Sequence, residues 1–396
     1  MHEQRTTNKE PRSKDNGRRT AGYGRMISEI PPAVFRDRRQ RLWESFEPLA
    51  VRLLLVSKPV DVYYLSGFRG SAGLLLLGAH QARLWVDPRY TLQAREQGQG
   101  VTVVETRESL GRTVARWIAR RYPGTVGYQD EHLSCAELTR LRREVRATQK
   151  RAAVRWRPVG FLLDELRMVK DRWEIERIRA AGRVTAEVFR EVLPLVQPGA
   201  RECDLAAEIE YRMKRRGAQG PAFDTIVASG PRGAWPHARA SSRRLRRDEL
   251  VILDLGAILA GYAADMTRTV YLGVPTRRAR ELYESVAEAQ RQTVHRLRAG
   301  MSGDEVDTVA RQSLASRKLA DYFTHSTGHG VGLDVHERPR LGRGEKALMP
   351  AGSVVTVEPG VYLEGYGGVR IEDTVLVSEH EPEILTPASR ESWFTG

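Results

Sequence analysis

The chain has 396 residues, a formal net charge of +14, 41% hydrophobic residues and two cysteines. This length exceeds one ordinary hydrophobic core, so two domains are expected. No apolar stretch approaches the ~20 residues of a membrane-spanning helix, and two cysteines are too few for a disulfide framework. We therefore predict a cytoplasmic protein without a membrane segment.

The positive charge is mostly arginine, in runs such as RRLRRDE, ARWIARRYP and RLRREVR. Clustered arginine attracts phosphate, but neither a nucleic-acid-binding motif nor interleaved aromatic residues accompany these runs. The runs therefore predict solvated helix faces, and we expect no specific nucleic-acid partner.

Residues 1–25 contain almost no large apolar residue, which predicts a disordered basic tail. They lack the apolar segment of a secretory signal, and Met26 is an alternative translation start. From 26 to 158, segments with a helical period alternate with strand-like runs such as VRLLLVS, GLLLLG and VTVVET. That alternation predicts an α/β domain with a mixed or parallel sheet.

The pattern changes in residues 159–396, where helices and strands come in blocks. Residues 161–196 predict one long helical segment, which is broken at Pro198-Gly199. Further helices are expected at 203–218, 277–298 and 303–318. Strands with antiparallel signals fill the remainder, so the second domain is predicted to be α+β.

Four carboxylates in this second domain lie in or beside apolar runs: Asp254 in LVILDLGA, Asp265 after AGYAA, Glu358 at the end of SVVTVEPG and Glu372 in GVRIEDTVLV. A buried carboxylate must stay protonated or find a cation. Together with His329 they predict a shared cation site. Oxygen ligands with a single imidazole favour manganese, cobalt or iron over a structural zinc. Our first expectation is manganese, with cobalt, iron or catalytic zinc as alternatives. Two ions about 3.5–4 Å apart could polarise a carbonyl.

Local spacing adds detail to this site. Asp254 and Asp265 flank LGAILAGYAA, with Gly261 placed for a turn. In a hairpin, residues equidistant from the turn face each other, and two facing carboxylates repel unless a cation lies between them. Glu358 shares a strand face with Thr356 by simple alternation.

Histidines gather in the segment FTHSTGHGVGLDVHE, which contains His325, His329 and His336. Its glycines exclude a stable helix and allow close backbone approach, so His329, between two glycines, is the expected ligand. The other two, with His237 in GAWPHAR, are expected to form hydrogen bonds or handle protons. Arg370 shares a strand face with Glu372, and an ion pair or a functional role is equally expected for it.

These residues resemble those of the pita-bread metallopeptidases, specifically the Xaa-Pro peptidases (prolidase and aminopeptidase P). The resemblance runs from about residue 28 to the C-terminus and rests on five motifs in order: FDTIVASGPRGAWPHARAS, LVILDLGAILAGYAADMTRTV, HSTGHGVGLDVHE, VVTVEPGVY and GVRIEDTVLV. YYLSGFRGSAG and LWVDPRYTLQARE resemble the family's creatinase-like N-terminal domain. The implied architecture is a creatinase-like α/β domain at 26–158 and a pita-bread α+β catalytic domain at 159–396.

The resemblance also implies a ligand set for two divalent metal ions. Asp254 would chelate one ion, and His329 and Glu358 the other. Asp265 and Glu372 would bridge both. A water or hydroxide between the ions would attack the peptide carbonyl.

Roles for the remaining residues follow from the same resemblance. Glu358 would act as base and then acid, and His336 and His237 would hydrogen-bond the substrate carbonyl or oxyanion. His325 would line a proline pocket or relay protons, and Arg370 would fix the site. The implied partners are peptides with proline in second position and a second copy of the chain in a homodimer.

Two other functions are compatible with this architecture. A creatinase-like hydrolase shares both domains but has no metal site, and a catalytically inactive pita-bread domain would serve as a peptide- or protein-binding module. Retention of all five ligand residues argues against both. The sequence leaves open whether the enzyme is an aminopeptidase or a dipeptidase.

Overall fold

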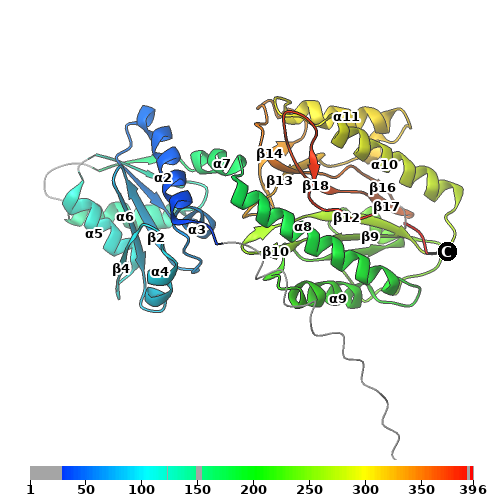
Figure 1. Ribbon diagram of the computed structural model, residues 1–396, viewed down its shortest axis with the longest axis horizontal. Coiled ribbons are helices and arrows are strands. Elements are labelled where there is room, and N and C mark those ends of the chain that lie inside the picture. Colours follow the sequence, from blue (N-terminus) through cyan, green and yellow to red (C-terminus); the bar gives the residue numbers. More distant parts are fainter. Residues whose placement is uncertain (1–28, 123, 149–153, 390–392, 396) are drawn as a thin grey trace, which may run out of the picture.

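The computed structural model describes residues 29–122, 124–148, 154–389 and 393–395, so the expectations for the 1–25 tail and for Met26 lie outside it. Figure 1 shows two lobes, with α7 (Phe161–Met168) and the start of α8 (Arg172–Val192) between them. Within the described ranges, no helix combines the length and apolar character needed to traverse a lipid bilayer.

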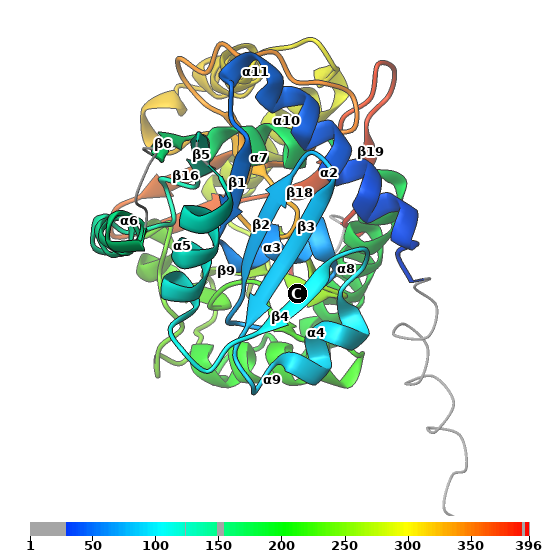
Figure 2. The ribbon, with the colours of Figure 1, turned by 90° about the vertical axis from the view of Figure 1, so that its left-hand side faces the viewer.

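The N-terminal lobe is built on a six-stranded sheet with strand order β4-β3-β2-β1-β5-β6, and β2, β3 and β4 show their broad faces in Figure 2. Its strands are β1 (Leu53–Val56), β2 (Leu74–Gly78), β3 (Gln81–Val86), β4 (Thr102–Glu105), β5 (Thr125–Tyr128) and β6 (Arg155–Pro158). β1 pairs parallel to β5 and antiparallel to β2, so the predicted mixed sheet is confirmed.

Helices cover both faces of this sheet because the residues of β1 alternate between two cores. Leu54 and Val56 pack with α2 (Pro32–Phe46), α3 (Pro59–Ser66) and α4 (Thr91–Gln97). Leu53 and Leu55 pack with α5 (Leu110–Arg121) and α6 (Cys135–Thr148). A strand buried on both sides explains why the run VRLLLVS is apolar throughout.

The prediction of one long helix at 161–196 is wrong, because the segment contains two α-helices, α7 and α8. Asp171 Oδ1 accepts a hydrogen bond from the backbone N–H of Glu174 at 3.0 Å, and Glu174 Oε2 accepts one from the N–H of Asp171 at 3.0 Å. This reciprocal capping box starts α8, and three residues separate α8 from the end of α7.

The second lobe places antiparallel strands between two pairs of helices. α8 and α9 (Glu202–Arg215) pack on one side, and α10 (Arg277–Arg296) and α11 (Gly303–Ala315) on the other, as Figure 1 shows. The first sheet has the order β12-β9-β8 and the larger one β14-β13-β15-β18-β19, while β16 pairs with β17 and β10 pairs with β7 and β11. The α+β prediction is confirmed.

The strand bounds of this lobe are β7 (Gly220–Pro221), β8 (Ile226–Ser229), β9 (Leu250–Leu255), β10 (Ala257–Leu259), β11 (Tyr262–Ala263), β12 (Met266–Tyr271), β13 (Gly328–Gly330), β14 (Glu337–Leu341), β15 (Val354–Val357), β16 (Gly360–Leu363), β17 (Gly367–Arg370), β18 (Asp373–Leu376) and β19 (Glu383–Ile384).

The expected hairpin forms, but its register differs from the prediction. Ala260 and Gly261 have φ of 50° and 89°, the positive values required by a tight two-residue turn. The turn is therefore centred one residue beyond the midpoint of the two aspartates. Asp254 pairs with Thr267, and Asp265 is its diagonal neighbour on the same face rather than its direct partner.

Candidate metal centre

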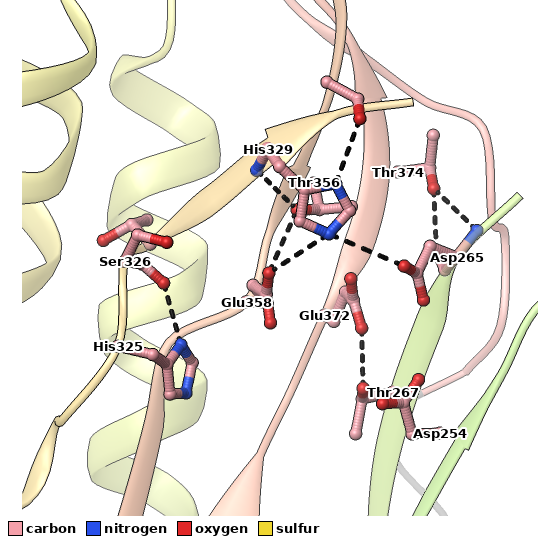
Figure 3. A network of polar contacts seen from close by, with 12 residues as sticks. Asp254, Asp265, Thr267, His325, Ser326, His329, Thr356, Glu358, Glu372 and Thr374 are labelled. Carbon is pink, nitrogen blue, oxygen red and sulfur yellow. Dashed lines mark hydrogen bonds and ion pairs between the residues drawn. The ribbon is translucent and has the colours of Figure 1, made fainter. Parts of the chain in front are cut away.

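The five predicted ligand residues come from separate strands or strand ends and converge on one point (Figure 3). Asp254 lies on β9, Asp265 precedes β12, His329 lies on β13, Glu358 follows β15, and Glu372 lies between β17 and β18. Ligand atoms of Asp265, His329 and Glu372 all lie within 4.8 Å of one another. His329 Nε2 is 3.7 Å from Asp265 Oδ2 and 3.5 Å from Glu358 Oε1.

Carboxylates crowd this point at a high electrostatic cost. Asp265 and Glu372 are 5% and 2% exposed. Burial, and then the charge of neighbouring carboxylates, raises the pKa of both groups well above the usual range. Burial also raises the pKa of Glu358 to about 8. A cation placed among these groups would offset the repulsion and favour their ionised forms.

Two buried carboxylate oxygens of the cluster lack a hydrogen-bond partner in the part of the chain that the structure describes. Asp254 Oδ1 and Asp265 Oδ1 are buried, and neither has a hydrogen-bond partner among the described residues. A buried unpaired carboxylate oxygen is costly unless something binds it. The set of carboxylate oxygens and one imidazole nitrogen fits divalent ions such as manganese, cobalt, iron or zinc.

His329 has its Nε2 free to act as a ligand. Its Nδ1 lies 3.0 Å from the Gly330 carbonyl, which can only accept, so Nδ1 carries the proton. Burial, and then the neighbouring His336, lowers the pKa of His329 to about 4, so the ring is neutral at pH 7. The Nε2 lone pair faces Asp265 and Glu358 (Figure 3).

The glycines beside His329 permit a close approach of three strands. A Cβ at Gly328 would collide with the Thr356 carbonyl of β15. A Cβ at Gly330 would collide with the Arg338 carbonyl of β14. The prediction that these glycines allow close backbone contact is therefore confirmed.

Threonine hydroxyls form hydrogen bonds with two of the carboxylates and orient them. Thr267 Oγ1 donates to Glu372 Oε2 at 2.6 Å, and Thr356 Oγ1 donates to Glu358 Oε1 at 3.3 Å. Thr356 matches the predicted shared face with Glu358. Thr267 was missed, although it stands two residues after Asp265 and alternation places both on one face.

Arg370 forms its carboxylate pair with Asp254 rather than with the adjacent Glu372. Its guanidinium is 3% exposed, and Nη2 donates to Asp254 Oδ2 at 2.6 Å. Nη1 donates to the Tyr362 hydroxyl at 2.8 Å and to the Pro236 carbonyl at 3.1 Å. Arg370 therefore links the candidate ligand Asp254 to Tyr362 and to the backbone at Pro236.

His325 is linked to Arg370 through the Tyr362 hydroxyl. Its Nδ1 donates to the Ser326 carbonyl at 2.8 Å, so its Nε2 accepts from the Tyr362 hydroxyl at 2.8 Å. Burial, and then the charge of Arg370, lowers the pKa of His325 to about 4. The ring is neutral, and a chain of donors runs from Arg370 through Tyr362 to His325.

His336 and His237 lie on the solvent side of the cluster, and both are exposed. The His336 ring packs edge-on against the His329 ring, with centroids 4.2 Å apart. Partial burial, and then the charge of His237, lowers the pKa of His336. Contacts thus link His336, His325 and Arg370 to the five candidate ligand residues, directly or through Tyr362.

Residues 176–379 match the model of Metallopeptidase family M24, and residues 38–169 match the Creatinase/Prolidase N-terminal domain. The Xaa-Pro dipeptidase of Pyrococcus furiosus is 35% identical over 358 residues, covering 90% of this chain and 99% of the relative. The chain belongs to metallopeptidase family M24. The predicted family resemblance is therefore confirmed.

Solved structures of M24 peptidases superpose along nearly the whole chain. The Xaa-Pro dipeptidase from Bacillus anthracis has a TM-score of 0.87 and 32% identity, covering 91% of this chain and 100% of that one. The X-Pro aminopeptidase from Thermotoga maritima has a TM-score of 0.82 and 33% identity, with the same coverage. The predicted creatinase-like and pita-bread fold is confirmed for this M24 chain.

Proposed function

We propose that this M24 peptidase hydrolyses Xaa-Pro peptide bonds with divalent metal ions, releasing the residue ahead of proline. The convergence of four carboxylates and one neutral imidazole on a single point carries the proposal. Relatives called Xaa-Pro dipeptidase and X-Pro aminopeptidase, each at least 32% identical, support the substrate class.

The proposed ligands divide between two ions, which are supplied as manganese in the assay below. Asp254 would hold one ion, and His329 and Glu358 would hold the other. Asp265 and Glu372 would be shared by both, in keeping with their burial at the centre of the cluster. Bound ions would polarise the scissile carbonyl and lower the pKa of water to near neutrality.

Glu358 is the proposed proton carrier. Its side chain is 17% exposed, against 7% for Asp265 and 12% for Asp254, so it has the best access to substrate among these three. It accepts a proton from the attacking water and returns it to the proline nitrogen. His336 and His237, on the solvent side, donate hydrogen bonds to the carbonyl oxygen as negative charge develops there.

The proline side of the site is formed by neutral groups. His325 packs edge-on against Phe323, with ring centroids 5.0 Å apart, and Tyr362 fixes its orientation. We assign this wall to the pyrrolidine ring, and Arg370 to holding Tyr362 and Asp254 in place. An Xaa-Pro bond lacks the amide N–H that ordinary peptidases bind, which explains a need for such a pocket.

The position of Arg340 favours dipeptides over longer peptides as substrates. It pairs directly opposite His329 across the β13–β14 ladder, and side chains opposite each other share one face of a sheet. Arg340 is exposed, so its guanidinium can meet the free carboxylate of a bound dipeptide. We propose that this contact makes Xaa-Pro dipeptides the preferred substrates.

The test supplies manganese-loaded protein with Xaa-Pro dipeptides, Xaa-Pro amides, Xaa-Pro-Yaa tripeptides and proline-free dipeptides. We expect cleavage of the Xaa-Pro dipeptides, and Arg340→Met should lower their kcat/KM by about 10- to 100-fold while leaving the amides unchanged. Arg343→Met, on an exposed neighbouring position, is the control. Equal losses for dipeptides and amides would contradict the carboxylate contact.

Metal analysis of the purified protein decides between a peptidase and a binding module. Bound transition metal with Xaa-Pro cleavage supports the peptidase, whereas absence of both after manganese loading supports an inactive module.

We further propose the domain division 26–158 and 159–396, a homodimer and a cytoplasmic location. Both cysteines, Cys135 and Cys203, are free thiols, which suits a reducing compartment.

A further inference from the structure

A buried network of charges joins the two lobes beside the candidate centre. Arg167 of α7 is 2% exposed, and its Nη1 lies 2.9 Å from Asp61 Oδ1. Its Nη2 lies 3.0 Å from Asp334 Oδ2 and also contacts the Glu337 carboxylate. We call this set the Arg167 network: Lys58, Asp61, Arg167, Lys170, Asp334 and Glu337.

Each carboxylate of the network has a second partner. Lys58 Nζ lies 2.7 Å from Asp334 Oδ2, and Lys170 Nζ lies 2.7 Å from Glu337 Oε1. Asp61 Oδ2 accepts from Gln129 Nε2 at 2.5 Å. Three positive and three negative groups therefore balance, and a planar guanidinium with several partners has little freedom to move.

The two acidic groups from the catalytic lobe flank His336 in sequence. Asp334 and His336 lie in the turn between β13 and β14, and Glu337 is the first residue of β14. The turn is tight: the N–H of Gly332 donates to the Asp334 carbonyl at 3.0 Å. A Cβ at Gly332 would collide with the Glu337 carboxylate, so the turn and the network fit closely together.

We propose that Arg167 is a positioning residue for His336. By holding Asp334 and Glu337, it fixes the turn so that the His336 ring stands against His329, and its contact with Asp61 makes the N-terminal lobe part of that support. The inference rests on the proposed role of His336 in hydrolysis. Buried ion pairs add little stability compared with apolar packing, so a role in geometry is a good reason to retain one.

A double-mutant cycle separates positioning from general fastening of the lobes. Arg167→Lys keeps one charge but not the planar fork, and Arg167→Met removes the charge. We expect Arg167→Lys to lower kcat by about 10- to 100-fold with metal content unchanged, as for other groups that orient active-site residues. In a His336→Ala background the same change should cost less than about 3-fold.

Arg38 provides a matched control. It is fully buried, and its Nη2 lies 2.7 Å from Asp171 Oδ2 across the same lobe junction, but it is not part of the Arg167 network. Arg38→Met should lower the melting temperature and leave kcat within about 3-fold of the parent. An Arg167→Lys loss that persists in the His336→Ala background, or that Arg38→Met reproduces, would overturn the proposal. Wild-type kcat in Arg167→Lys would do so too.

A readout without substrate keeps the inference distinct from the proposed function. The Cε1–H resonance of His336 is identified by its loss in the His336→Ala spectrum of histidine-labelled protein. It should shift or split in Arg167→Lys and stay in place in Arg38→Met. An unmoved resonance overturns the positioning role. A shifted resonance in a protein without Xaa-Pro activity supports the positioning contact and contradicts only the proposed function.

Discussion

The Thr267 hydroxyl donates its proton to Glu372 Oε2 at 2.6 Å (Figure 3), and Arg370 Nε donates to the same hydroxyl at 3.1 Å. A hydroxyl has one proton to donate, so the arginine commits it to the carboxylate. This leaves Glu372 Oε1 free of that hydrogen bond and available to a metal ion. The orientation of a central candidate ligand thus depends on one threonine.

Thr267→Val preserves the shape of the side chain and removes this hydrogen bond. We expect manganese affinity to fall by about 10- to 100-fold, because Glu372 is no longer held in its binding orientation. Titration calorimetry with manganese on the metal-free protein measures the change.

Thr293→Val is the matched control. Thr293 is 1% exposed and donates only within α10, to the Ala289 carbonyl at 2.7 Å. The Thr293→Val variant should lower the free energy of unfolding about as much as Thr267→Val does, without changing manganese affinity. Equal affinities for the Thr267 variant and the parent would show that the hydroxyl does not orient Glu372.

Asp265→Asn and Glu372→Gln each replace a proposed bridging carboxylate with a neutral amide of the same size. We expect turnover of Xaa-Pro dipeptides to be abolished, because the site would lose negative charge where two cations are proposed to bind close together. Steady-state rates at saturating manganese test this, with metal content measured in parallel. Glu364→Gln, at an exposed position after β16, should be neutral. Near-normal rates in either bridging variant would contradict the proposed ligand set.

The sequence was sufficient where local period and residue chemistry decide the outcome. Alternation placed Glu358 and Thr356 on one face, and glycines marked the close approach at His329. Both signals act over a few residues, as does the alternation that could have revealed Thr267.

Pairings between distant segments were not predictable in the same way. Arg370 and Asp254 are 116 residues apart, and only the fold decides that they form a pair. The hairpin offset of Asp254 and Asp265 depends on which residues take positive φ in the turn. The Arg167 network has no sequence signature, because its partners come from three separate segments.

The metal-free protein should become less stable as pH rises through the neutral range. Burial raises the pKa of Glu358 from its ordinary value of 4.5 to about 8, so the folded state holds this proton more tightly than the unfolded state. Its contribution to folding stability is present below pH 4.5 and is lost as pH approaches 8. Denaturant unfolding of metal-free protein between pH 5 and 9 measures the trend.

Glu358→Gln isolates the contribution of this group, because glutamine does not titrate. The metal-free parent should lose stability relative to the variant as pH rises from about 5 to about 8 and remain parallel to it above that range. Parallel profiles throughout would show that Glu358 titrates normally. Manganese should stabilise the parent and release protons on binding, which calorimetry in buffers of different ionisation enthalpy detects.

His336→Ala tests the division between metal binding and transition-state stabilisation. Its ring packs on His329 but lies on the solvent side, so we expect unchanged metal content and a fall in kcat on the order of 100-fold, as for loss of one hydrogen-bond donor to an oxyanion. His380→Ala, an exposed histidine in the loop after β18, should change neither. Loss of metal in His336→Ala would instead place His336 among the ligands, and a rate equal to that of the parent would remove it from the reaction.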